Sequence, residues 1–341
     1  MERWTPVDGD TFLTKENFVF CVFGYEHPDG QAFSFLKYVP SQLKKLFSIR
    51  FVERKWKFQD VELVRPEKLY TAKNYQEIMK TFRSNFPHYV YACPFYGKEI
   101  ASSPFEFIKR VYVPRECLHE LLQRKEKDLL QELAVELATL LSEVSHVSLE
   151  EFGIRGSIAL DMHTTRSDID FAVYGAKNFR NVEEAVGKLN DEGTLSYIFS
   201  TKLDRFRKFK GRYKNALFMF SAVRGREEIE HSYGTCTYHP IQSLKFQCRV
   251  VNDNEAMFKP AIYKITDYQP LDPSSELADE ESPRKVVSMI GCYRNLARKG
   301  GRIEVSGMLE KVENIENGAV HHQVVVGTGI HEDEYICPIS G

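Results

Sequence analysis

Two pairs of residues in the middle of the chain have the types and spacing needed to bind a metal ion and a phosphorylated substrate. Gly156-Ser157 is followed, after ten residues, by Asp168 and Asp170. Residues two apart on a strand point to the same face, so both carboxylates lie together. Neighbouring carboxylates repel each other unless a cation lies between them, and their hard oxygen atoms suit Mg²⁺. The sequence therefore predicts a magnesium site at Asp168 and Asp170.

The Gly-Ser pair and Ser167 are predicted to supply the phosphate and hydrogen-bond contacts of the same site. Gly156 allows a backbone to approach a phosphate closely, and Ser157 offers a hydroxyl and an amide at a predicted helix start, where anions are favoured. Ser167 is placed to cap the turn or to hydrogen-bond the carboxylates. We expect such a site to orient a nucleoside triphosphate for in-line attack and to stabilise charge on the leaving pyrophosphate.

The residues around these pairs predict the elements that position them. Strands are expected at 152–155, 168–174 and 216–223, a short helix at 156–162 and a longer helix at 181–189. Strand, helix, strand, helix, strand predicts an α/β or α+β catalytic core over residues 146–232.

The regions before the core are less regular. Residues 1–112 read as a mixed α/β N-terminal region. In 113–145, leucines from Leu118 to Leu141 recur at helical intervals, which predicts one long amphipathic helix or two with a break near Lys125. We expect this helical linker to pack against the domain that follows.

In the region after the core, apolar and polar residues alternate with a period of two. Residues 242–265 and 301–328 look like rough copies of one hairpin, with a surface loop at 271–284 between them. This pattern predicts that 233–341 form a small antiparallel β barrel or sandwich.

Composition limits the class of protein. The 341 residues allow two or three domains, and the net charge of −2 gives no overall basic field that would argue for nucleic acid. No apolar run approaches the ~20 residues of a spanning helix, so no membrane partner is expected. The start has no signal-peptide pattern. Seven scattered cysteines without a C-x-x-C pair disfavour structural zinc and suggest a reduced, cytoplasmic protein.

A basic run from Lys202 to Lys214 holds seven Lys and Arg residues, with Phe206, Phe209 and Tyr213 among them. Two interpretations stay open. The run forms a phosphate or nucleic-acid contact beside the site, or it is a solvated loop whose charge is offset elsewhere.

The central motif resembles the signature of the DNA polymerase β-like nucleotidyltransferase superfamily. The matching residues are Gly156, Ser157, Asp168 and Asp170. The resemblance implies that the Gly-Ser pair binds nucleotide phosphates and that the aspartates hold two Mg²⁺ ions. It also implies a third carboxylate, on the third strand, that helps bind metal and activates the attacking hydroxyl.

A longer string is similar to a group of uncharacterised prokaryotic nucleotidyltransferases that carry this core in mid-chain. The string is Arg155-Gly-Ser-x-Ala-Leu-x-x-His163-x-x-x-Ser167-Asp-Ile-Asp-Phe-x-Val-Tyr-Gly175, followed later by Phe258-x-Pro260-Ala-x-Tyr263 and a Gly-rich segment from Gly301 to Gly329. The best third strand, 216–223, holds no acid. The candidates for the third carboxylate are therefore Asp204, Glu227, Glu228, Glu230 and Asp253.

Two functions follow from these observations. The first is a Mg²⁺-dependent nucleotidyltransferase that moves a nucleoside monophosphate from an NTP to a hydroxyl or phosphate acceptor on a protein, an RNA or a small molecule. The second is a catalytically weak or inactive nucleotide- or RNA-binding module with the β-rich tail as its platform.

Overall fold

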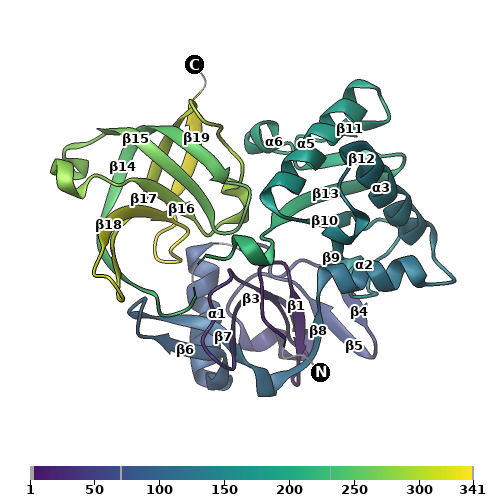
Figure 1. The fold of residues 1–341 in the computed structure, drawn as a ribbon. Coiled ribbons are helices and arrows are strands. Elements are labelled where there is room, and N and C mark those ends of the chain that lie inside the picture. The colour runs from purple at the N-terminus through teal and green to yellow at the C-terminus, as the bar shows by residue number, and fades with distance from the viewer. Residues whose placement is uncertain (1–3, 70, 231, 340–341) are drawn as a thin grey trace.

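Three β-sheets divide the chain into three parts that follow one another in sequence. The computed structural model describes residues 4–69, 71–230 and 232–339. Figure 1 shows the N-terminal domain below, a core with helices at upper right and a barrel at upper left. The fold is of the mixed α+β class, as the sequence predicts.

The N-terminal domain is an eight-stranded sheet covered by one helix. Its main order is β4-β5-β3-β2-β1-β8, with β7 also paired to β3, and β6 to β7. Helix α1 (Ala72–Asn85) buries Ile78, Met79 and Phe82 among the phenylalanines of the sheet. The strands are β1 (Thr11–Thr14), β2 (Val19–Val22), β3 (Gln31–Pro40), β4 (Trp56–Phe58), β5 (Val61–Val64), β6 (Val90–Cys93), β7 (Lys98–Pro104) and β8 (Ile108–Tyr112).

The leucine-rich stretch forms two helices, α2 (Pro114–Gln123) and α3 (Leu129–Ser145). Asp128 begins α3, because its carboxylate accepts hydrogen bonds from the amides of Leu130 and Gln131 at 2.9 and 3.0 Å. Both helices share one hydrophobic cluster with the sheet that follows, so they pack against the core as predicted.

The core sheet has five strands in the order β11-β12-β13-β10-β9. Only β10 and β13 are parallel; the other neighbours are antiparallel. Helices α4 (Gly156–Ala159), α5 (Ala176–Asp191) and α6 (Lys202–Arg207) connect the strands β9 (Phe152–Arg155), β10 (Ile169–Tyr174), β11 (Leu195–Tyr197), β12 (Lys210–Tyr213) and β13 (Ala216–Val223). Helix α4 is shorter than the sequence suggests, because Asp161 adopts the left-handed conformation (φ 49°), which a helix does not continue through.

The two faces of the core sheet differ in polarity because side chains alternate along each strand. Phe171, Val173, Phe218 and Phe220 lie on one face and are buried in a cluster with α3 and α5. Asp170 lies on the opposite face of β10, together with the residues paired to it on the neighbouring strands. The helices thus cover one face of the sheet, while the other carries Asp170 beside a small buried cluster of Ala172, Tyr174 and Val223.

The C-terminal part is a barrel in which five strands pair in a ring. The order is β14-β15-β16-β18-β17, and β17 returns to pair with β14, while β19 extends from β17. The two predicted hairpins are present as β14–β15 and β17–β18. The predicted barrel is not fully antiparallel, because β16 and β18 run parallel. The strands are β14 (Cys236–Glu255), β15 (Ala261–Pro270), β16 (Lys285–Ser288), β17 (Arg302–Asn314), β18 (Val320–Val326) and β19 (Tyr335–Ile339).

Specific contacts join the three parts. Leu160 and Met162, which follow α4, are buried in a cluster with Tyr38, Trp56 and other side chains of the N-terminal sheet. At the barrel, the Lys259 ammonium pairs with the Asp8 carboxylate at 2.8 Å, and both side chains are buried. The N-terminal domain therefore contacts both the core and the barrel.

Short 3-10 helices complete the connections. They are η1 (Ser41–Leu46), η2 (Pro87–Tyr89), η3 (Phe105–Phe107), η4 (Leu149–Glu151), η5 (Arg226–Glu228), η6 (Pro273–Ser275), η7 (Asp279–Glu281) and η8 (Gly291–Tyr293). The predicted surface loop at 271–284 contains η6 and η7. Across the described ranges, no helix has the length and apolar character required to span a membrane.

We expect Leu137→Ala to destabilise the protein, because Leu137 is fully buried between α3 and the core. The loss in free energy of unfolding should be between about 2 and 5 kcal/mol, from the lost burial and the cavity left behind. Leu129→Ala on the same helix is the matched control: Leu129 is 60% exposed, and its loss should stay below about 0.5 kcal/mol. Urea denaturation measures both, and equal losses would contradict the packing of α3 described above.

Candidate functional site

The two aspartates of the motif lie at the start of β10. Asp168 directly precedes the strand and is exposed, while Asp170 lies inside it and is partly buried. The Oδ1 atom of Asp170 is buried without a hydrogen-bond partner among the described residues. An uncompensated buried carboxylate oxygen is costly, so this atom is suited to a cation or a donor that arrives with a ligand.

Gly156 is held directly against Asp170. The strands β9 and β10 pair so that Arg155 lies opposite Asp170, which brings the next residue, Gly156, to the carboxylate. A Cβ atom at position 156 would overlap Asp170 Oδ2, and the backbone has φ +68°, which favours glycine. Position 156 therefore requires glycine both for space and for conformation.

Ser157 follows Gly156 as the second residue of α4 and is partly buried. Its hydroxyl has no hydrogen-bond partner in the part of the chain that the structure describes, while its carbonyl accepts from the Met162 amide at 2.9 Å. The backbone of Ser157 thus helps to close the connector, and its side chain remains available to a ligand.

Ser167 closes the turn that leads into the carboxylates. Its hydroxyl accepts a hydrogen bond from the Thr164 amide at 3.0 Å, and its own amide donates to the Thr164 carbonyl at 2.9 Å. His163, in the same connector, bonds through Nε2 to Asp128 at 2.6 Å and so ties the connector to the start of α3. These contacts hold Asp168 in place.

A row of side chains crosses the sheet through Asp170. Arg155 on β9, Met219 on β13 and Lys210 on β12 are successive partners in register with Asp170 and one another, so all four share one face. The guanidinium of Arg155 also donates to the Ser221 hydroxyl. The face therefore combines a carboxylate with two cations.

The N-terminal domain adds positive charge to the same place. Burial and the Asp168 carboxylate raise the pKa of Asp170, whereas the charges of Lys37, Arg155 and Arg65 lower it. Arg65 lies over the Trp56 ring at 5.4 Å, and its Nε has no hydrogen-bond partner among the residues described. Sequence reasoning missed Lys37 and Arg65, because nothing in the motif points to residues about a hundred positions away.

The third carboxylate does not come from β13. This strand pairs with β10 as predicted, and its residues on the Asp170 face are Leu217, Met219, Ser221 and Val223. Across the described ranges, no group of three or more His, Cys, Asp or Glu side chains lies close enough to hold a metal. The carboxylates that the motif brings to this end of β10 are thus Asp168 and Asp170.

The candidates proposed from sequence for that carboxylate are occupied elsewhere. Asp204, the third residue of α6, accepts from the Ser200 and Thr201 amides and so completes the capping box with Thr201. Glu228 accepts from the Ala176 and Gly225 amides, beyond the far end of β10.

A second stretch with the alternation of a strand, 244–250, ends near Asp253, but it does not lie beside Asp170 either. Residues 244–250 belong to β14 of the barrel and not to the strand beside Asp170. At the end of that stretch, Asp253 pairs with Arg180 at 2.9 Å and Arg298 at 3.3 Å. The last two candidates, Glu227 and Glu230, are exposed. Asp204, Glu228 and Asp253 are thus used for caps and ion pairs.

The basic run divides between two environments. Lys210 lies in the row of Asp170, and Arg212 is opposite Leu217 on the same face. Arg207 is buried beside Asp204, Lys214 pairs with Glu136, and Phe209 and Tyr213 are buried in the core. Only part of the run is therefore placed to contact a ligand of Asp170.

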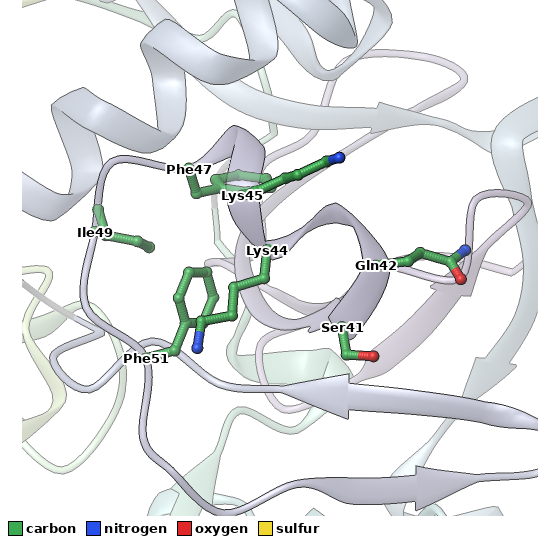
Figure 2. Close-up of a pocket in the computed structure, with 7 residues that line it drawn as sticks. All are labelled: Ser41, Gln42, Lys44, Lys45, Phe47, Ile49 and Phe51. Carbon is green, nitrogen blue, oxygen red and sulfur yellow. The ribbon is translucent and has the colours of Figure 1, made fainter.

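A separate hollow lies in the N-terminal domain. Figure 2 shows it beside η1, with Lys44 over the ring of Phe51 at 5.8 Å. Its volume is about 360 Å³, and all of its lining residues come from positions 41–51. It includes no residue of the motif and no carboxylate, so we do not assign the predicted chemistry to it.

Comparisons with known proteins give one relative and no function. The chain is 26% identical over 341 aligned positions to the uncharacterized protein MJ1086 of Methanocaldococcus jannaschii, with 94% of each chain covered. No protein-family description matches the chain, and no solved structure matches it.

We expect the charges around Asp170 to set its pKa in opposite directions. Asp168→Asn removes a like charge and should lower the pKa of Asp170, while Lys37→Gln removes a cation and should raise it. A carbon-13 NMR titration of the aspartate carboxyl groups measures both. Asp161→Asn, a change in the same connector, is the control and should leave this pKa unchanged. Unaltered titration of Asp170 in both test variants would contradict the described cluster.

Proposed function

We propose that the protein is a Mg²⁺-dependent nucleotidyltransferase with a polymerase β-like core, which transfers a nucleoside monophosphate from an NTP to a hydroxyl or phosphate acceptor. The observation that carries the proposal is the contact of Gly156 with the Asp170 carboxylate. It joins the two halves of the motif, which are separated by ten residues in sequence, at one point.

Asp168 and Asp170 are the residues that would hold Mg²⁺. The buried, unpartnered Oδ1 of Asp170 and the exposed Asp168 carboxylate fit a hard cation that keeps several waters and substrate oxygens. When bound, Mg²⁺ neutralises charge on the phosphates and on the leaving pyrophosphate. Because the pKa of Asp170 is raised, its ability to bind a cation is lost as the pH falls through that pKa.

The cations of the site bind the triphosphate. Lys210 and Arg212 approach from the core sheet, and Lys37 and Arg65 from the N-terminal domain. The hydroxyl of Ser157 adds a donor without an internal partner within the described ranges. Together they hold the phosphates on the carboxylate face and supply the preorganised charge that such a reaction needs.

The proposed reaction is a nucleophilic substitution at the α-phosphorus of the NTP. The acceptor oxygen forms a bond to the α-phosphorus, the bond to the bridging oxygen breaks, and pyrophosphate leaves with that electron pair. The proton of an acceptor hydroxyl passes to solvent, since β13 presents Leu217, Met219 and Ser221 to this face rather than a carboxylate.

A second candidate function follows from the residues of β13, which include no carboxylate. Without a carboxylate on β13, the site would bind a nucleotide and turn it over weakly or not at all. In that case the protein is a nucleotide- or RNA-binding module with the barrel as its platform.

We also propose that the protein works in the reducing cytoplasm. All seven cysteines are among the described residues, and all are free thiols. Reduced cysteines without metal-ligand spacing suit that compartment.

Incubation with NTPs labelled on the α-phosphate, Mg²⁺ and a lysate of acceptors tests the proposal. We expect pyrophosphate release and a labelled acceptor, with a loss of roughly 100-fold or more in Asp170→Asn. Gly156→Ala should lose NTP binding, because its Cβ would displace the Asp170 carboxylate. Asp161→Asn is a matched control, since Asp161 pairs with Arg124 and asparagine tolerates its left-handed backbone.

The outcomes separate the two functions. Mg²⁺-dependent NTP binding without any pyrophosphate release would favour the binding module. Activity equal to wild type in Asp170→Asn would contradict a role for this carboxylate, and neither binding nor turnover in the wild type would contradict both functions.

A further inference from the structure

A large cavity lies between the N-terminal domain and the barrel, away from the aspartates. Its volume is about 570 Å³, within the ~300–1,000 Å³ typical of sites for small ligands. The core reaches it through Arg224, which follows the carboxyl end of β13, and through residues 228–230, whereas Asp170 pairs with Met219 in the middle of that strand. Met219 and Arg224 are five positions apart, or about 16 Å at ~3.3 Å per residue.

Aromatic rings form much of the wall on the N-terminal side. Phe33 and Phe35 come from β3, Tyr25 from the preceding loop and Tyr75 from α1. Tyr96 and Tyr238, which also line the cavity, stack with ring centroids 4.5 Å apart and planes within 6°, and so join the N-terminal domain to the barrel. Such rings offer flat faces on which a planar ring can stack.

Two lysines face each other on the barrel side. Lys264 on β15 and Lys285 on β16 are direct partners in the antiparallel ladder, and both line the cavity. Within the described residues, neither ammonium forms a salt bridge or a hydrogen bond. Like charges directly opposite on neighbouring strands are destabilising. Burial and the neighbouring Lys264 lower the pKa of Lys285, although Cys236, Glu255 and Glu26 oppose this shift.

Most of the carboxylates in the wall are already engaged. Glu255 pairs with Arg224 at 2.8 Å, and Glu228 accepts two backbone amides. Glu310 is buried and accepts from Gln323 at 3.2 Å, which leaves it further acceptor capacity. Glu26 and Glu230 also line the cavity, so the lysine pair is a local positive cluster in a wall that also holds carboxylates. Glu310 adds an acceptor for hydroxyl or amino groups.

The position of the cavity on the barrel points to the same kind of ligand. Five-stranded Greek-key barrels of the oligonucleotide-binding type use the face of their second and third strands, flanked by the loops between strands one and two and between four and five. Here the second and third strands are β15 and β16, which carry the two lysines. Pro260 and Ala319, from the corresponding loops, also line the cavity.

We propose that this cavity is a second nucleotide site, in which the base stacks on the aromatic wall and the phosphate lies between Lys264 and Lys285. Ribose hydroxyls or a base amino group donate to the Glu310 carboxylate. The ligand is a free nucleotide or the terminal nucleotide of a single-stranded RNA, since both present the same base, ribose and phosphate.

Calorimetric titration in EDTA tests the site without a metal at the aspartates. The probes are AMP, adenosine, ribose 5-phosphate and a single-stranded RNA pentamer, with the wild type and the variants Lys264→Gln/Lys285→Gln and Tyr238→Leu. Lys299→Gln is the matched control, because Lys299 is an exposed lysine of the barrel outside the cavity. Asp170→Asn serves as the control for the other site, and thermal melting checks that each variant is folded.

We expect AMP to bind the wild type at least tenfold more tightly than adenosine or ribose 5-phosphate. The lysine and tyrosine variants should each weaken AMP at least tenfold, while Lys299→Gln and Asp170→Asn should not change its affinity. A pentamer that binds more tightly than AMP, with loss in the same variants, identifies an RNA end; equal affinity identifies a free nucleotide. No binding of AMP or pentamer, or binding that survives in both folded cavity variants, would overturn the proposal.

Discussion

The candidate site depends on the contact between Gly156 and the carboxylate of Asp170. The register of β9 against β10 places Arg155 opposite Asp170, and the chain must then turn away without a side chain in that space. Shifting either strand by one residue would send Asp170 to the face that holds Phe171 and Phe218, where no partner for a charge exists among the buried hydrophobic residues. The packing of α3 and α5 on that apolar face therefore fixes the register, and the register fixes the site.

Local patterns were enough to predict β9, β10 and β13 of the core, but they missed β11 and β12 and the surroundings of the sheet. The predicted ranges 152–155 and 216–223 agree with β9 and β13 to the residue, because both are short apolar runs with polar or glycine neighbours. Lys37 and Arg65 could not be found in this way, since tertiary contacts such as the docking of Leu160 and Met162 on the N-terminal sheet bring them to Asp170. Likewise, alternation predicts the barrel hairpins, but the parallel pairing of β16 with β18 needs a crossover that no local pattern encodes.

The search for a third carboxylate shows where sequence proximity misleads. Asp204 and Glu228 lie within the core, and each has backbone amides within hydrogen-bond distance, so both serve to end or begin local structure. Asp253 follows an apolar alternating run that resembles a core strand, yet that run belongs to β14, and Asp253 pairs with Arg180 across the interface between the barrel and α5. An acid in a suitable sequence position is therefore a weak indicator of catalysis unless its strand is known.

The N-terminal domain connects the two proposed sites through a single strand. Phe33 and Phe35 of β3 line the cavity, while Lys37, two residues on, acts on the Asp170 carboxylate. The ladder between β2 and β3 shifts register at this point, because Val19 pairs with Tyr38 but the next residue, Phe20, pairs with Leu36. A bulge re-aims the side chains that follow it, so Leu36 and Tyr38 enter different hydrophobic clusters. One irregular step in β3 thus lets the same strand present aromatic rings to one ligand and a cation to another.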